Sequence, residues 1–304
     1  MIDAFHQSHN MTSKNLVSYS YSNILVREAH DLRMAHCITS EITEKTKLVL
    51  IGFPFDEGVK INAGIPGAKK GPKAIREQLG KMVATESALN EQIADIGDID
   101  CEGKSVEEAQ ELLGTLVSEL LEENLFPIIL GGGHETSFGH FLGYVKANQE
   151  IDIINIDAHT DVRELVEGQA HSGSPFRQAI EHESEALKGY HVIGAKRNRV
   201  AKEHALYVQE NGSLCYSDEK IGLPKTGNSI LLTIDLDVFD CSVMPGVSAR
   251  NANGFGKNEG LRLIKNVIQT GKVRSIDVVE LNPERDENGI STLFAAELVY
   301  FFLD

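Results

Sequence analysis

The sequence of 304 residues lacks the marks of several protein classes. Its four cysteines are too few and too scattered for a disulfide framework or a CxxC metal site, so we expect reduced thiols. No apolar run approaches the roughly 20 residues that a membrane-spanning helix needs. The first residues also lack the charged-then-apolar order of a secretory signal. These absences predict a soluble, cytoplasmic protein with no membrane partner.

Positive charge is also scarce. The chain has 29 Lys and Arg against 45 Asp and Glu, a formal net charge of −16. Such acidity disfavours nucleic acid as a partner, although a local cationic pocket for small anions remains open. The sequence also contains neither GxxxxGK[ST] nor a strand-linked GxGxxG, which disfavours the common phosphate-binding loops.

Short apolar runs alternate with helical patterns from about residue 46 onward. Most of the runs are nearly continuous in apolar residues, as in parallel strands covered on both faces. Helix starts are indicated by the capping box of Ser105 and Glu108 and by Gly71-Pro72. We therefore expect an α/β fold with a parallel sheet, one domain over 46–304 and a polar N-terminal extension over 1–45. The predicted strands are 48–53, 126–132, 151–157, 190–195, 229–235 and 274–282.

Three of these strands end in residues that can bind metal ions. The segment after FPIIL supplies His134, the segment after IDIIN supplies Asp157, His159 and Asp161, and the segment after SILLT supplies Asp235 and Asp237. A spacing of two residues in extended chain places side chains on one face, about 6–7 Å apart. Because ligands gather at the carboxyl ends of parallel strands, we expect the three groups to converge.

Charge decides what such a cluster would hold. Four carboxylates leaving apolar strands need about four positive charges, and these segments contain no cation beyond Arg163. Two divalent ions about 3.5–4 Å apart would balance them. Carboxylates with some imidazole favour manganese. Each motif alone is weak, since a DxD often ends a solvated strand and GGGH can be a tight turn, so the prediction depends on their conjunction.

The motifs GGGHE, NIDAHTD and TIDLDVFD, in this order and spacing, resemble the metal-binding motifs of the ureohydrolase (arginase/agmatinase) superfamily. The resemblance implies a three-layer α/β/α fold with a central, mostly parallel sheet and two Mn²⁺ ions per chain. It also implies hydrolysis of a C–N bond at an amidine or guanidine carbon by a hydroxide that bridges the metals. Carried over by position, it makes metal ligands of His134, Asp157, His159, Asp161, Asp235 and Asp237.

Two of the residues acquire catalytic roles from the same resemblance. Asp161 would hydrogen-bond the attacking hydroxide and steady the tetrahedral intermediate. Glu280, in the segment VVELNP, would orient the cationic amidine. By resemblance the family also forms trimers or hexamers, so we expect a homo-oligomer.

The loop HSGSPFRQA bears on the substrate. Ser172 and Phe176 occupy the positions of the histidines found in agmatinases and arginases, and His171 is a neighbour that would substitute. The segments SGSPFRQ, GGGHET and DVFDCSVMPGVSA are most similar to the branch of the superfamily that cleaves N-formimidoyl-L-glutamate into L-glutamate and formamide during histidine degradation. The alternatives are an agmatinase or another guanidino-acid hydrolase, and a metal-binding homologue without turnover.

A dicarboxylate substrate requires cations and hydrogen-bond donors in its pocket. Arginine suits carboxylates because its guanidinium binds them in a bidentate manner. The candidates for substrate binding are Lys60, Asn62, Ser172, Ser174 and Arg177.

Overall fold

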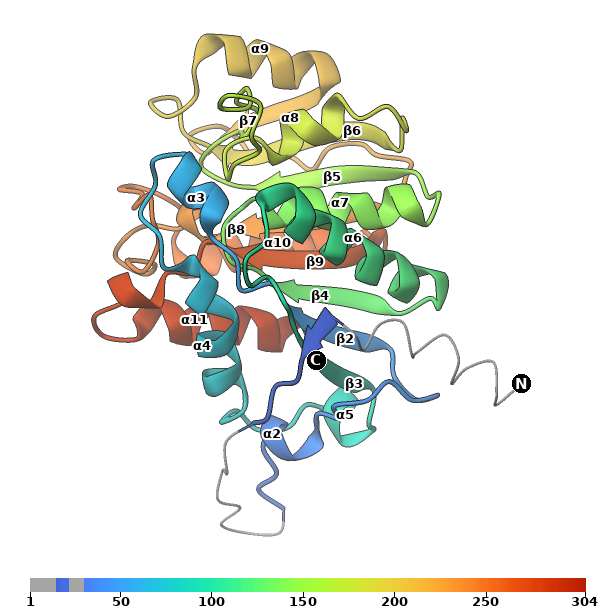
Figure 1. Cartoon of the computed structure of the whole chain (residues 1–304). Coiled ribbons are helices and arrows are strands. Elements are labelled where there is room, and N and C mark those ends of the chain that lie inside the picture. Colours follow the sequence, from blue (N-terminus) through green and yellow to red (C-terminus); the bar gives the residue numbers. More distant parts are fainter. Residues whose placement is uncertain (1–14, 22–29) are drawn as a thin grey trace.

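A nine-stranded sheet forms the centre of the protein (Figure 1), in a computed structural model that describes residues 15–21 and 30–304. The strand order is β1-β3-β2-β4-β9-β8-β5-β6-β7, with β1 antiparallel to β3 and all other neighbouring pairs parallel. The strands are β1 (Leu16–Val17), β2 (Leu48–Gly52), β3 (Ile93–Ile99), β4 (Phe126–Leu130), β5 (Ile151–Ile156), β6 (Leu187–Ala195), β7 (Gly212–Tyr216), β8 (Ile230–Asp235) and β9 (Val273–Val279).

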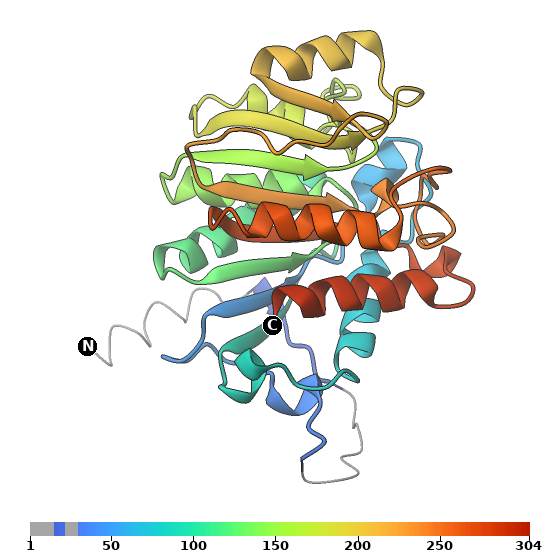
Figure 2. The same ribbon diagram turned by 180° about the vertical axis from the view of Figure 1, so that it is seen from behind.

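Helices cover both faces of the sheet. In Figure 1 α6 and α7 lie in front of it, and in Figure 2, seen from behind, α10 and α11 lie in front. The α-helices are α2 (Met34–Cys37), α3 (Glu57–Ile61), α4 (Gly71–Leu79), α5 (Glu86–Leu89), α6 (Val106–Glu122), α7 (Thr136–Lys146), α8 (Pro175–Ile180), α9 (Lys202–Asn211), α10 (Lys257–Ile268) and α11 (Ile290–Phe302). The short 3₁₀ helices are η2 (Ala68–Lys70), η3 (Leu236–Val238) and η4 (Pro283–Arg285).

The two faces of the sheet bury two separate apolar cores. Along β2, Val49 and Ile51 pack in the core formed with α6 and α7, whereas Leu50 packs in the core formed with α4, α10 and α11. This alternation follows from the opposite directions of successive side chains in a strand. The predicted three-layer α/β/α fold with a mostly parallel sheet is thereby confirmed.

All six predicted strands are present, with shifts of a few residues at their ends. The sequence did not indicate β3, because IADIGDI places two aspartates and a glycine inside the strand. Those aspartates, Asp95 and Asp98, are held by the fully buried guanidinium of Arg76. The edge strand β7, GSLCY, was also missed because it is short and only half-buried.

The predicted helix starts are confirmed. Ser105 Oγ accepts the N–H of Glu108 at 3.1 Å, and the Glu108 carboxylate accepts the N–H of Ser105 at 2.8 Å, which completes the capping box of α6. Pro72 lies in the first turn of α4.

The described residues before 46 contact the remainder of the protein. The strand β1 pairs with β3, the Tyr21 hydroxyl donates to Asp95 at 2.8 Å, and Met34 is fully buried. The division into an extension over 1–45 and a domain over 46–304 stays a prediction. In the described part of the chain, no helix is long and apolar enough to cross a membrane.

Candidate metal centre

Four adjacent strands, β4, β9, β8 and β5, bring the sequence-predicted site together. His134 follows β4, Glu280 follows β9, Asp235 ends β8 and Asp157 follows β5. Because these strands are parallel, their carboxyl ends lie at the same edge of the sheet. Residues up to 146 positions apart in the sequence therefore become neighbours, as the hydrogen bond between His134 and Glu280 shows.

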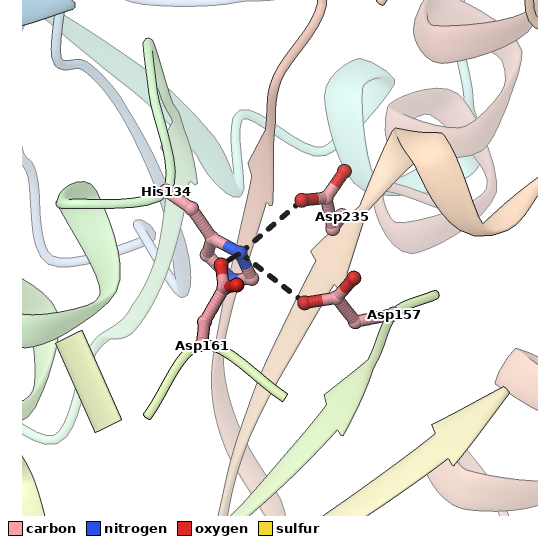
Figure 3. Close-up of side chains that lie close together, drawn as sticks. All are labelled: His134, Asp157, Asp161 and Asp235. Atoms are coloured by element: carbon pink, nitrogen blue, oxygen red, sulfur yellow. Dashed lines mark ion pairs between the residues drawn. The ribbon is translucent and has the colours of Figure 1, made fainter. Parts of the chain in front are cut away.

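The first group of side chains surrounds Nδ1 of His134 (Figure 3). This atom lies 2.9 Å from Asp161 Oδ2, 3.2 Å from Asp235 Oδ2 and 3.4 Å from Asp157 Oδ2. We call these four residues the inner set. Their potential ligand atoms all lie within 4.8 Å of one another.

A second group lies around His159. Its Nδ1 is 3.1 Å from Asp237 Oδ2 and 3.5 Å from Asp157 Oδ1. We call His159, Asp237 and Asp157 the outer set, and their ligand atoms again lie within 4.8 Å of one another. Asp157 belongs to both sets, with one oxygen directed to each imidazole, so it is placed to bridge two ions.

The local backbone orients the aspartates. Asp157 Oδ1 accepts the N–H of His159 at 2.7 Å, and Asp235 Oδ1 accepts the N–H of Asp237 at 2.7 Å. In both motifs the carboxylate is thus held by the backbone two residues later, which fixes its direction before any ligand arrives.

Two residues of the site have a left-handed backbone. Asp161 has φ of 41° and Glu280 has φ of 68°, a region that costs non-glycine residues on the order of 1 kcal/mol or more. Nearby, a Cβ on Gly132 would lie 1.8 Å from the carbonyl oxygen of Phe55. Only glycine fits there, which explains part of the GGG run before His134.

A buried polar network supports the inner set from behind. His134 Nε2 lies 3.1 Å from Thr233 Oγ1, and the Thr233 hydroxyl donates to Asp277 Oδ1 at 2.5 Å. Asp277 Oδ2 lies 2.7 Å from His140 Nδ1, and His140 Nε2 lies 2.6 Å from Ser275 Oγ. Since the single proton of Thr233 goes to Asp277, Thr233 accepts from His134 Nε2–H. With that proton on Nε2, the lone pair of His134 Nδ1 is available to a cation held between it and the carboxylates.

The electrostatics of the cluster are those of crowded buried charges. Burial and the charge of Asp237 raise the pKa of Asp235 well above its ordinary value. Burial alone would lower the pKa of His134, but the carboxylates of Asp161 and Asp235 raise it well above its usual range. For Asp157 burial is outweighed by hydrogen bonding and charge from His159 and by the charge of His134, which lower its pKa to about 2. Protons thus partly balance charges that cations would balance better.

The donor set fits a pair of divalent ions. His134 Nδ1 and Asp237 Oδ1 are buried, yet neither makes a hydrogen bond to any described residue. Buried polar atoms without a hydrogen bond are unusual in a folded core, and one cation in each set would satisfy them. Four carboxylates with two imidazoles also provide the oxygen-rich ligation that manganese prefers.

Glu280 lies beside the inner set. Its Oε1 accepts the N–H of His134 at 2.9 Å, and burial, with further contributions from Asp237 and Asp161, raises its pKa to about 8. Burial and the neighbouring Glu280 likewise raise the pKa of Glu135 to about 8. Glu280, Asp161, His159, Asp235 and Asp237 open onto a cleft of about 190 Å³ above the ligand sets.

Of the five predicted substrate-binding residues, the structure brings two to this cleft. Asn62 and Ser172 line it and are joined by a hydrogen bond of 3.1 Å from Asn62 Nδ2 to Ser172 Oγ. Lys60 is exposed and pairs with Glu57, and Ser174 is buried in hydrogen bonds with the backbone of His171. These two residues do not line the cleft.

Arg177 does not line the cleft either. Its Nε donates to the carbonyl of Val162 at 2.9 Å, its Nη1 pairs with Glu181 at 2.7 Å, and its guanidinium covers the ring of Tyr207. His171, the neighbour considered as a proton shuttle, is buried and bonded to backbone atoms of Glu164 and Gly173.

Sequence reasoning missed two cationic residues of the cleft, Arg163 and Arg199. For Arg163 a signal existed, because it lies two residues after the metal-binding motif that ends at Asp161. Nothing in the sequence around Arg199 marked it, since it reaches the cleft from the loop after β6.

Comparisons with known proteins agree with this geometry. The model of the arginase family matches residues 46–303. The chain belongs to the arginase family. Among curated relatives, the formimidoylglutamase of Salmonella paratyphi B is 37% identical over 265 residues, with 83% of each chain covered. The formimidoylglutamase of Clostridium tetani is 33% identical over 288 residues, covering 87% of this chain and 84% of its own.

Solved structures of the arginase family show the same fold. A crystal structure of Trypanosoma cruzi formiminoglutamase with Mn²⁺ has a TM-score of 0.81 and 31% identity, and the match covers 90% of this chain and 97% of that one. Bacillus subtilis arginase has a TM-score of 0.69 and 25% identity, and the match covers 85% of this chain and 98% of that one. The inner and outer sets thus lie at the carboxyl edge of the sheet in an arginase-family fold.

Proposed function

We propose that this protein hydrolyses N-formimidoyl-L-glutamate to L-glutamate and formamide with two Mn²⁺ ions per chain. The observation that carries the proposal is the pair of ligand sets joined by Asp157 in a chain 37% identical to a formimidoylglutamase. His134, Asp157, Asp161 and Asp235 would hold one ion, and His159 and Asp237 would hold the other together with Asp157. Both ions, when bound, would activate water for attack on the amidine carbon.

The protein's own residues would position the reacting groups. Asp161 lies at the cleft with its carboxylate next to His134 Nδ1, where it would accept a proton from the attacking water. Glu280 lines the same cleft and would orient the protonated amidine through a charge-assisted hydrogen bond. Both side chains are held by a strained backbone, which pre-organises them for this role.

No histidine occupies the position of a proton shuttle in the loop after Asp161. Phe176 is fully buried, stacked on Tyr190 with ring centroids 4.5 Å apart, and Ser172 lines the cleft. A formimidamide is less basic than a guanidine and tolerates the absence of a dedicated shuttle. This difference favours a formimidoyl substrate over the guanidino substrates of agmatinases.

Product analysis tests the proposal. The purified protein, loaded with Mn²⁺, is incubated separately with N-formimidoyl-L-glutamate, arginine, agmatine and 4-guanidinobutyrate, and formamide and urea are quantified. We expect formamide from the first substrate and at most traces of urea from the others. Preferential urea release would identify a guanidine hydrolase, and full Mn²⁺ occupancy without any product would identify a metal-binding protein without turnover.

The remaining expectations belong to the same proposal. We propose that 46–304 forms the catalytic domain, that the protein acts in the cytoplasm, and that it assembles as a homo-oligomer of three or six chains. Light scattering coupled to size-exclusion chromatography measures the assembly directly, since a trimer, a hexamer and a monomer of a 33.3 kDa chain differ widely in mass.

A further inference from the structure

The cleft above the ligand sets has a cationic rim within an acidic protein. Arg163 reaches it from the loop after β5, and Arg199 reaches it from the loop after β6. The two residues are 36 positions apart in the sequence, and only the parallel arrangement of β5 and β6 places both loops at this edge.

Among the described arginines that form no ion pair, Arg163 and Arg199 are the two that line the cleft. Other arginines are neutralised by acidic residues. Arg76 pairs with Asp95, Arg177 with Glu181, and Arg197 with Asp218 and Glu219. In the described part of the chain, neither Arg163 nor Arg199 forms an ion pair. With 45 acidic residues available, two unneutralised guanidinium groups in one cleft call for an anionic ligand.

The arginines are held by neutral acceptors. Arg163 Nη1 donates to Asn62 Oδ1 at 3.1 Å, and Asn62 in turn donates to Ser172. Arg199 Nη1 donates to the carbonyl of Ala249 at 3.2 Å, and its Nη2 donates to the carbonyl of Arg250. Such contacts fix the direction of each guanidinium but leave its positive charge available.

We propose that Arg163 and Arg199 determine substrate specificity by binding the two carboxylates of the substrate, an inference that rests on the proposed function. Arginine is suited to this because its planar fork binds a carboxylate with two charge-assisted hydrogen bonds. The same charges repel cationic tails such as the ammonium group of agmatine. The cleft therefore selects an amidine attached to a dicarboxylate.

The geometry assigns one carboxylate to each arginine. Arg199 Nη1 lies 3.2 Å from Nε2 of His159, so this guanidinium is next to the outer set. In N-formimidoyl-L-glutamate the α-carboxylate is on the carbon that bears the amidine nitrogen, so it stays close to the metals and binds Arg199. The side-chain carboxylate extends outward and binds Arg163, which is exposed.

Substrates that lack one carboxylate test this assignment. N-formimidoyl-4-aminobutyrate lacks the α-carboxylate, and N-formimidoyl-L-2-aminobutyrate lacks the side-chain carboxylate. We expect Arg199→Gln to lower kcat/KM for N-formimidoyl-L-glutamate by about 10- to 150-fold, mainly through KM, and to change it little for 4-aminobutyrate derivatives. Arg163→Gln should show the reverse pattern, with little change for the 2-aminobutyrate derivative.

Arg197→Gln is the matched control, because Arg197 lies in the same loop as Arg199 but pairs with acidic residues and does not line the cleft. Its kinetics should equal those of the wild type. Equal losses on all three substrates would overturn the assignment, and so would loss of bound Mn²⁺ from Arg199→Gln, because Arg199 would then only position His159.

A binding measurement separates this inference from the proposed function. L-Glutamate is titrated calorimetrically into the Mn²⁺-loaded wild type and both variants, which requires no turnover. If formamide is not released but the wild type binds L-glutamate and the variants bind it at least about 10-fold more weakly, the proposed function fails and the carboxylate assignment stands. If formamide is released and the variants bind L-glutamate like the wild type, the assignment fails alone.

Discussion

The inner and outer ligand sets use the same chemical groups but are supported by different parts of the molecule. His134 of the inner set has a side chain 1% exposed and is backed by Thr233, Asp277 and the buried network behind them. His159 of the outer set has a side chain 22% exposed, and its second nitrogen faces Arg199 at the cleft. The inner set is therefore fixed by the core, whereas the outer set lies at the wall of the cleft.

The two sets show how one site can combine a rigid ion position in the core with an accessible one at the cleft. A ligand whose second nitrogen is held by a buried carboxylate chain has a fixed ring orientation and a fixed tautomer. A ligand on the cleft wall is coupled to whatever occupies the cleft. We expect the inner ion to bind more tightly and the outer ion to respond more strongly to bound substrate.

The largest effect should come from Asp157, the residue that both sets share. Asp157→Ala removes a ligand from each ion, and we expect loss of both ions and a fall in kcat/KM of at least about 1,000-fold. Mn²⁺ content by elemental analysis and formamide release are the measurements. Asp218→Ala, an exposed change away from the cleft, is the control. If Asp157→Ala retained both ions, Asp157 would not be the bridging ligand.

A smaller effect, confined to the inner set, should follow from Thr233. Thr233→Val preserves shape but removes the acceptor for His134 Nε2–H. It also removes one donor to Asp277, which keeps its contacts with Ser137 and His140. We expect the affinity of one Mn²⁺ ion to fall by about 10- to 100-fold while the other is unchanged. Thr233→Ser keeps the hydroxyl and should restore the affinity. Mn²⁺ is titrated into the metal-free protein and binding is followed by electron paramagnetic resonance. This measurement shows whether the affinity falls for one Mn²⁺ ion or for both.

The smallest effect concerns the pH dependence of the metal-free protein. The pKa values of Glu135 and Glu280 are raised to about 8, so the folded protein holds protons that the unfolded chain has released. Their stabilisation is full below the ordinary pKa of about 4.5 and is lost as pH rises toward 8. Within that window each group lowers the unfolding free energy by up to about 1.4 kcal/mol for each unit of rising pH.

Glu135→Gln sharpens this expectation. Glutamine keeps the acceptor for the N–H of Gly58, which Glu135 Oε1 binds at 2.9 Å, but it cannot titrate. The unfolding free energy of the metal-free protein is measured by urea unfolding between pH 5.5 and 7.5. Its slope against pH should correspond to about one proton fewer in this variant than in the wild type. An unchanged slope would mean that Glu135 is ionised in the folded protein.

The sequence was most informative where one local pattern sufficed. Continuous apolar runs located β2, β4, β5, β6, β8 and β9, and Ser105 with Glu108 located the start of α6. It was least informative for β3, where Asp95 and Asp98 interrupt the pattern and are tolerated only because Arg76, 19 and 22 positions earlier, is buried against them. Compensation between distant residues leaves no local signal.

The substrate side of the site shows the same limit. Asn62 and Ser172 line the cleft, and their role in substrate binding stays a prediction. Lys60 and Arg177 instead pair with acidic residues on their own helices or next to them. A cation's availability depends on which carboxylates fold beside it, and single motifs do not contain that information. Arg199 was recognised as a cleft residue only from the position of the loop after β6 in the structure.

The local sequence predicts the ligand chemistry, because two-residue spacing at the end of an apolar strand fixes which side chains share a face. It also determined the fold class, because apolar runs and helical periodicity are local properties. Three features came from the tertiary structure: Asp157 faces both imidazoles, a buried network holds His134, and two arginines of the cleft form no ion pair. These three features depend on strand order and on contacts between segments far apart in the chain. No single stretch of sequence contains the information about such contacts.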